Sequence, residues 1–233
     1  MTHVTQLQKV IREIESHSDP KCREAMIRFK ITSKAYGVPI PTLYRMAKKI
    51  GKNHSLAMQL WKHAWFETRV LAASVAEPAG LTEKQMEAWV KDFDSWTVCD
   101  LCCSNLFDKT PRAYEKAFEW SKRNREFEKR AGFVLMAVLA VHDKQASDAK
   151  MQRFLPVIVR ESSDERVYVK KAVNWALRQL GKRNRFLNKK SIALAKRIRK
   201  QDSKAARWIA NDALRELESR AVQKRLARLA SSP

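Results

Sequence analysis

Apolar residues recur at three- and four-residue spacing along almost the whole chain, which is the pattern of amphipathic helices. The clearest stripe comprises Val169, Ala172, Val173, Ala176, Leu177 and Leu180. The spacing predicts helices near residues 3–16, 21–35, 40–51, 54–65, 67–77, 82–91, 93–107, 111–123, 125–142, 147–161, 164–180, 188–200, 203–217 and 219–230. Only short loops remain between them.

Short amphipathic helices joined by small loops favour pairs that stack side by side, because each helix must bury its apolar face against its neighbours. We therefore predict an all-α protein, a HEAT-like repeat solenoid of stacked antiparallel helix pairs that forms one domain over residues 1–233. The low numbers of glycine (5) and proline (7) fit an all-helical protein. An irregular helical bundle is the alternative, because the repeat is weak in the sequence itself.

The chain is strongly basic, with 47 Lys and Arg against 25 Asp and Glu and a net charge of +22. The basic residues follow the helical pattern, so we expect them on a folded surface. A stacked helical array is curved, and its concave surface would then be basic. This balance predicts a polyanionic partner, with nucleic acid as the first candidate. Residues 181–190, GKRNRFLNKK, are predicted to be a basic loop.

The N-terminal sequence lacks the apolar core and cleavage site of a secretory signal, and no apolar run approaches the length of a membrane span. The 4 cysteines lie within helical patterns, which fits a reducing compartment. We expect a cytoplasmic protein, nucleoid-associated if the source is bacterial. We also expect a monomer with no membrane contact and no obligate protein partner.

A carboxylate stands in an apolar stripe at residues 94–103, DSWTVCDLCC. In a helix, Asp100 would share one side with Trp96 and Cys103. Burying a carboxylate there is costly without a charge or hydrogen-bond partner. Asp100 should therefore be paired, exposed in a cleft or functional, and an ion pair with an Arg of a neighbouring helix is the structural alternative.

Trp175 lies on the polar side of the helix that carries the stripe at 169–180, at helical spacing from Lys171, Arg178 and Lys182. The ring could simply shield the stems of its basic neighbours. The functional alternative is an aromatic wall on a nucleic-acid surface.

Two other kinds of site find little support in the sequence. Cys99, Cys102 and Cys103 lie within one helical segment without a second Cys or His pair, so core thiols are favoured over a metal site. The scattered glycines form neither a Walker loop nor a dinucleotide fingerprint, so no cofactor is expected.

The order of several motifs resembles the AlkD-type DNA alkylation repair proteins, which are HEAT-like repeat DNA glycosylases that remove alkylated purines. The principal motifs are DSWTVCD at 94–100 and VKKAVNWALRQLGKRN at 169–184, with support from residues 36–51, 60–73 and 127–139. The resemblance is strongest over residues 30–200, and 201–233 adds basic C-terminal helices. It implies excision of positively charged N3- and N7-alkylated purines from duplex DNA, without a base-flipping pocket.

The resemblance also implies catalytic roles for particular residues. Trp96 and Asp100 match the family's Trp-x-x-x-Asp pair, Trp175 matches its second cleft tryptophan, and Arg130 matches its cleft arginine. Lys129 or Arg125 could replace Arg130 if the register is shifted. Ser95 stands where some members have a second aromatic residue, so substrate range could differ. Contacts with DNA are expected from Lys170, Lys171, Arg178, Lys182, Arg183 and Arg185.

Two other classes of function remain open. A non-catalytic DNA-binding module that recognises damaged or distorted DNA would explain the charge, but it would not need Asp100. A protein-interaction scaffold would explain the helices, but it would not need the basic balance, and its binding would depend less on salt than phosphate contacts do.

Overall fold

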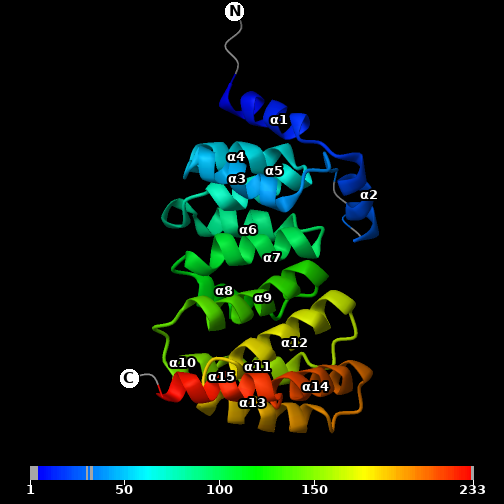
Figure 1. The fold of residues 1–233 in the computed structure, drawn as a ribbon, viewed down its shortest axis with the longest axis vertical. Coiled ribbons are helices and arrows are strands. Elements are labelled where there is room, and N and C mark those ends of the chain that lie inside the picture. The colour runs from blue at the N-terminus through cyan, green and yellow to red at the C-terminus, as the bar shows by residue number, and fades with distance from the viewer. Residues whose placement is uncertain (1–4, 30, 32–33, 232–233) are drawn as a thin grey trace, which may run out of the picture. The chain divides into compact units, whose positions relative to one another are not determined.

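A computed structural model of the chain describes residues 5–29, 31 and 34–231, and every element assigned in this part of the chain is helical. The chain divides into two compact units, residues 1–112 and 113–233 (Figure 1). Each unit is described by itself. A single domain over 1–233 and a concave basic surface stay predictions. None of the described helices is long and apolar enough to cross a membrane.

The first unit contains seven α-helices and two short 3₁₀ helices among its described residues. These are α1 (Gln6–Ser16), α2 (Pro20–Arg28), α3 (Ile40–Ile50), α4 (His54–His63), α5 (Phe66–Val75), η1 (Pro78–Gly80), α6 (Glu83–Lys91), α7 (Trp96–Asn105) and η2 (Phe107–Lys109). Helix α5 is the central element, because it packs against α3, α4 and α7 and is almost entirely buried.

A buried carboxylate in α5 fixes the segment before α3. Glu67 is 0% exposed, and its carboxylate accepts backbone N–H groups from Tyr36 (3.0 Å), Gly37 (2.8 Å) and Val38 (3.1 Å). Gly37 has φ +88°, and a Cβ there would lie 2.6 Å from the Asp19 carbonyl oxygen. The chain therefore needs glycine at this close turn.

The second unit contains eight α-helices among its described residues. These are α8 (Ala113–Trp120), α9 (Glu126–His142), α10 (Asp148–Gln152), α11 (Phe154–Arg160), α12 (Val167–Gly181), α13 (Arg185–Ile198), α14 (Lys204–Leu217) and α15 (Arg220–Ser231). Helix α9 is buried from Glu128 to Ala140 and packs against α8 and α12. Helices α12, α13 and α14 also pack against one another.

Most predicted helices are present, and three differences have local causes. The predicted helix at 147–161 divides at Arg153, because Pro156 lacks a backbone N–H and is tolerated in the first turn of a new helix. The loop predicted at 181–190 is mostly the start of α13, whose N-cap is Asn184. The helix predicted at 21–35 ends at Arg28, and residues 30, 32 and 33 lie outside the described part.

Candidate functional site

Helix α7 carries Trp96 and Asp100 on its more exposed side. The Ser95 hydroxyl caps the helix by accepting the Val98 backbone N–H at 3.4 Å. The buried side consists of Val98, Cys99, Cys102 and Cys103. Trp96 and Asp100 are partly exposed and lie one turn apart, so they share a face. The sequence placed Asp100 within an apolar stripe, whereas in the structure it lies at the exposed edge of that stripe.

Trp96 borders an apolar pocket of the first unit. Its indole Nε1 donates a hydrogen bond to the Phe29 carbonyl oxygen at 3.4 Å. The pocket has a volume of about 250 Å³. Its lining comes from α2, the segment before α3, and α5 and α7: Cys22, Ala25, Met26, Phe29, Ile31, Pro39, Ile40, Phe66, Trp96 and Thr97. Glu67 therefore holds the backbone that leads into one wall of this pocket.

The thiols beside Asp100 are core groups. Cys99, Cys102 and Cys103 are 0% exposed. Burial raises the pKa of Cys102 and Cys103 well above the usual value. For Cys103, a hydrogen bond with Cys99 and then the charges of Cys99, Cys102 and Asp100 raise it further. Protonated, buried thiols are poor metal ligands, which supports the prediction of core packing.

Arg130 lies on α9 in the second unit and is 6% exposed. Its Nη1 donates to the backbone carbonyl oxygen of Tyr168 at 2.6 Å. Tyr168 is in the first turn of α12, the helix that carries Trp175 two turns later. Arg130 therefore ties α9 to the start of α12.

The two alternatives to Arg130 have different surroundings. Lys129 is 9% exposed, and its Nζ contacts Glu161 at 2.5 Å and Asp164 at 3.3 Å. Arg125 is exposed and forms an ion pair with Glu128 at 3.0 Å. Of the three basic residues, only Arg125 leaves most of its side chain open to solvent.

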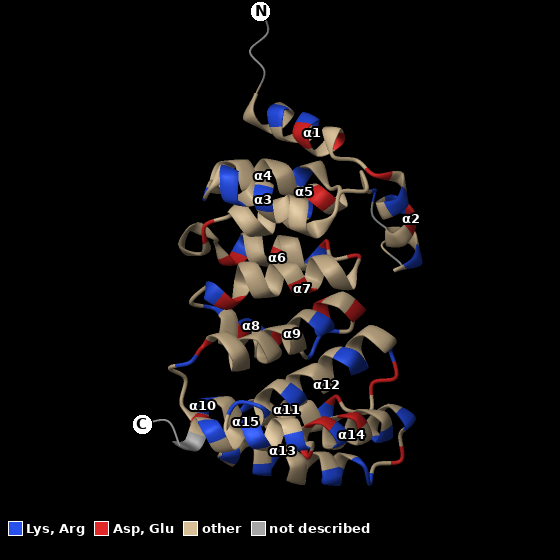
Figure 2. Cartoon of the chain, in the orientation of Figure 1, with Lys and Arg blue, Asp and Glu red and all other residues tan. Residues whose placement is uncertain are grey.

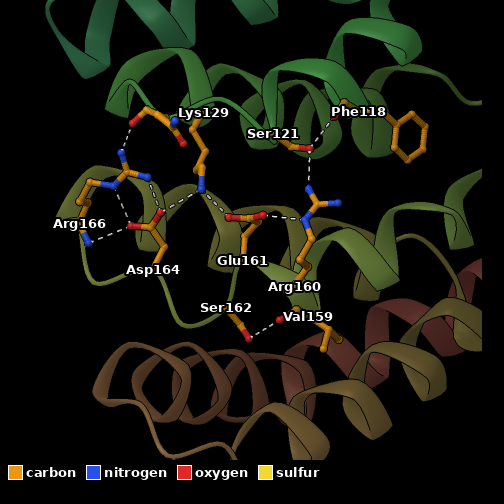
Figure 3. A network of polar contacts seen from close by, with 10 residues as sticks. Phe118, Ser121, Lys129, Val159, Arg160, Glu161, Ser162, Asp164 and Arg166 are labelled. Atoms are coloured by element: carbon orange, nitrogen blue, oxygen red, sulfur yellow. Dashed lines mark hydrogen bonds and ion pairs between the residues drawn. The ribbon is translucent and has the colours of Figure 1, made fainter.

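Figure 3 shows Lys129 within a polar network that joins the start of α9 to the α11–α12 connection. Arg166 donates to Asp164 through Nε at 2.9 Å, and Arg160 contacts Glu161 at 2.6 Å. Burial raises the pKa of Asp164, but hydrogen bonds from Arg166 outweigh it and the net pKa is lowered. The network stabilises this connection, and a DNA phosphate would have to displace two carboxylates to reach Lys129.

Helix α12 presents Trp175 at its partly exposed side. All six residues of the predicted stripe at 169–180 are buried, which confirms that prediction. Two basic residues near Trp175 are paired with α14: Arg178 Nη1 lies 2.6 Å from Glu216, and Lys182 Nζ lies 2.6 Å from the same carboxylate. Lys171 is exposed.

The other basic residues expected to contact DNA differ in their surroundings. Arg183 donates to the carbonyl oxygens of Ala140 (3.0 Å), Lys144 (3.2 Å) and Ala146 (2.8 Å) and so fixes the turn after α9. Lys170 Nζ lies 5.6 Å from the centroid of the Trp208 ring. Arg185 is exposed at the first position of α13. Roles in DNA binding stay predictions for all six basic residues.

Trp208 on α14 is not among the site residues predicted from the sequence. It is 40% exposed and lies outside the buried stripe, which comprises Ala205, Ala206, Ile209, Ala210, Ala213, Leu214 and Leu217. The argument that singled out Trp175, an aromatic residue on the polar side of an amphipathic helix, applies equally to Trp208.

The structure thus places the predicted catalytic residues in two pairs. Trp96 and Asp100 share a face of α7 in the first unit. Arg130 and Trp175 lie on α9 and α12, which pack extensively against each other in the second unit.

The sequence matches the family described as DNA alkylation repair enzyme over residues 10–217. Among curated proteins, no sequence matches the chain. A solved structure from a new family of proteins related to the HEAT-like repeat DNA glycosylases, with affinity for branched DNA structures, is similar to this chain with a TM-score of 0.80. The two are 19% identical, and the match covers 95% of this chain and 96% of the other. The similarity confirms the predicted all-α, HEAT-like repeat fold.

Proposed function

Because the chain belongs to the DNA alkylation repair enzyme family, we propose that it is a DNA glycosylase that hydrolyses the N-glycosidic bond of N3- and N7-alkylated purines in duplex DNA. One observation carries the proposal. Trp96 and Asp100 lie one turn apart on the partly exposed face of α7, so that a carboxylate and an aromatic ring can be reached from the same side.

The chemistry of the lesion suits catalysis by one carboxylate without a separate acid. A purine alkylated at N3 or N7 carries a positive charge and is already a good leaving group, so it needs little acid assistance. The larger task is to stabilise the positive charge that develops on the sugar. Asp100 would place its negative charge near C1′ of an oxocarbenium-like transition state and position the attacking water.

Trp96 would contact the damaged nucleotide beside Asp100, and Trp175 offers a second aromatic surface within the second unit. An indole ring attracts a cation through its π face, and both the alkylated base and the sugar of the transition state are positively charged. Trp96 and Trp175 are both partly exposed, so each offers ring surface to a ligand. Arg130 would act indirectly, by holding the first turn of α12 and with it the helix that carries Trp175.

Duplex DNA would be held by the exposed basic residues of the second unit. Lys171 and Arg185 are the exposed members of the predicted set. Helix α15 adds Arg220, Lys224, Arg225 and Arg228 (Figure 2). In this proposal the protein works as a cytoplasmic monomer without a cofactor.

The second candidate is a DNA-binding protein without glycosylase activity that recognises damaged or distorted DNA. The solved structure with the same fold favours it, because that protein belongs to a family with affinity for branched DNA. Such a protein would use the basic residues in the same way but would not depend on the Asp100 carboxylate.

The deciding experiment is single-turnover release of 7-methylguanine from duplex DNA. Asp100→Asn removes the charge and keeps the shape, so we expect its release rate to fall by about 100-fold or more. Asp202→Asn is the matched control, because the Asp202 carboxylate is fully exposed. An unchanged rate in a folded Asp100→Asn variant would refute the role of the carboxylate. Salt-sensitive binding without release by the wild type would favour the second candidate.

A further inference from the structure

Helices α12 and α14 run side by side in the same direction, joined by a ladder of polar and aromatic contacts. Lys170 faces Trp208, with Nζ 5.6 Å from the ring centroid. One turn later Asn174 donates to Asp212 at 2.7 Å. After another turn Arg178 contacts Glu216 at 2.6 Å. Both helices advance by four residues at each step, so the ladder shows parallel neighbours.

Trp208 is the aromatic rung of this ladder and is open to solvent. Trp208 is 40% exposed, although α14 has a complete buried stripe without it. Val167, in the first turn of α12, is 49% exposed. The start of α12 and the first two turns of α14 therefore present apolar and aromatic surface beside a lysine.

The charge around Trp208 suits an anion. Lys171 and Lys204 are exposed, and neither takes part in an ion pair among the described residues. The Glu165 carboxylate caps α14 by accepting the Ala205 backbone N–H at 2.9 Å and the Ser203 hydroxyl at 3.0 Å, and these bonds together with the charges of Lys170 and Lys204 lower its pKa. Three lysines therefore stand against this carboxylate beside Trp208, which leaves a net positive charge. The acidic residues further along the ladder, Asp212 and Glu216, are bound by the α12 side chains of Asn174 and Arg178.

An exposed tryptophan flanked by lysines offers a flat ring for a base and cations for the adjoining phosphates. In a continuous duplex the base faces are covered by their neighbours in the stack. Unpaired bases at a flap, gap or junction leave those faces free. A site of this kind therefore discriminates by the presence of unpaired bases and not by sequence.

We propose that Trp208, with Lys170, Lys171 and Lys204, is a stacking site for an unpaired nucleobase, through which the protein prefers DNA that carries a single-stranded branch. The inference rests on the proposed function in DNA repair. Trp175 lies on the exposed side of the same α12, four residues beyond Lys171, so the stacking site would adjoin the ring of Trp175 within the second unit.

The competing explanation is that the Trp208 ring only covers the alkyl chain of Lys170. Two substitutions of Trp208 distinguish these explanations. Trp208→Phe keeps a π face for stacking, whereas Trp208→Leu keeps apolar bulk over the lysine but has no π face. Phe186→Ala is the matched control, since Phe186 is 45% exposed with Lys190 Nζ 5.6 Å from its ring centroid, but it lies on α13 outside the ladder.

The experiment compares the Kd for a labelled continuous duplex with the Kd for the same duplex carrying a short single-stranded flap, at one fixed salt concentration. We expect the wild type, Trp208→Phe and Phe186→Ala to bind the flapped DNA more tightly by about 10-fold. We expect Trp208→Leu to bind the two DNAs equally. Circular dichroism checks that each variant is folded.

Either of two results would overturn the inference: a wild type without a preference for the flap, or a folded Trp208→Leu variant that keeps the preference. Release of 7-methylguanine by the wild type from a continuous alkylated duplex is measured in parallel. Release of 7-methylguanine without a preference for the flap would refute the stacking site and support the proposed glycosylase activity. Flap preference without release supports the stacking site and refutes the glycosylase.

Discussion

Removing the charge of the Glu67 carboxylate tests most directly how the fold supports the candidate site. It is fully buried and accepts three backbone N–H groups, from Tyr36, Gly37 and Val38. These residues lead directly to Pro39, which lines the pocket beside Trp96. Glu67→Gln keeps the side-chain shape and removes the charge, so it isolates the contribution of the carboxylate.

The expected loss of stability follows from the geometry. Oε2 accepts only the Tyr36 N–H, and Oε1 accepts both other N–H groups. In the glutamine variant the side-chain NH₂ would face one of the three backbone N–H groups, so that hydrogen bond would be lost. The other two hydrogen bonds would be accepted by a neutral amide oxygen instead of a charged carboxylate. With about 2 kcal/mol for a charge-assisted bond and about 1 kcal/mol for a neutral one, these changes total about 4 kcal/mol. A neutral amide costs less to bury, which leaves a loss of about 2–3 kcal/mol.

Urea unfolding followed by circular dichroism measures the loss, and amide hydrogen exchange localises it. We expect a lower unfolding midpoint and faster exchange at the backbone N–H groups of Tyr36, Gly37 and Val38. Glu24→Gln, at an exposed position on α2, is the matched control and should change stability by less than about 0.5 kcal/mol. If Glu67→Gln behaves like this control and the three amides keep their protection, the account of the segment before α3 is refuted.

Two further predictions concern the second unit. A Cβ at Gly132 would lie 2.4 Å from the Ser121 backbone nitrogen and 2.9 Å from the Ala117 carbonyl oxygen. Gly132→Ala should therefore lower the free energy of unfolding by about 2 kcal/mol despite the better helix propensity of alanine, and an unchanged urea midpoint would contradict this close packing. The Tyr114 hydroxyl donates to Asp143 at 2.7 Å and holds the pKa of that carboxyl below its ordinary value of 3.8. The hydrogen bond therefore stabilises the fold above pH 3.8, and the stabilisation is lost as pH falls through the lower folded pKa. Tyr114→Phe should lower the urea midpoint at pH 7, and its difference from the wild type should shrink below pH 3.8; a difference independent of pH would show that the carboxylate is not involved.

The helical period was enough to predict most of the fold, because it is a property of neighbouring residues. The stripe on α12 was predicted from positions within a few turns and is present in the structure, and the capping box of Thr82 and Gln85 on α6 is an equally local feature. Ser162 and Glu165 have the same three-residue spacing as Thr82 and Gln85 but form no capping box, because the Glu165 carboxylate instead caps α14 by accepting the Ala205 backbone N–H, 40 residues away along the chain. Spacing alone cannot distinguish these two outcomes.

The same limit applies to the candidate site. Helical spacing placed Trp96 and Asp100 on one face, but the exposure of that face depends on the helices packed around α7. The carboxylate that pairs with Arg178 is 38 residues away, so the sequence showed a basic face where the structure has ion pairs. Glu67 meets its donors across 29 to 31 residues and gave no local signal. Trp208 did carry a local signal, the one already used for Trp175.

The ion pairs also change how the net charge of +22 bears on function. Arg178 and Lys182 hold α14 beside α12, and Arg183 fixes the turn after α9. These cations set the positions of the helices that carry the exposed tryptophans. Replacing one of them would leave a partly buried partner without its bond, so its effect on DNA binding would be mixed with a loss of stability. Replacing exposed Lys171 should instead lower affinity and the salt dependence of binding without that loss, and is therefore the cleaner probe of phosphate contact.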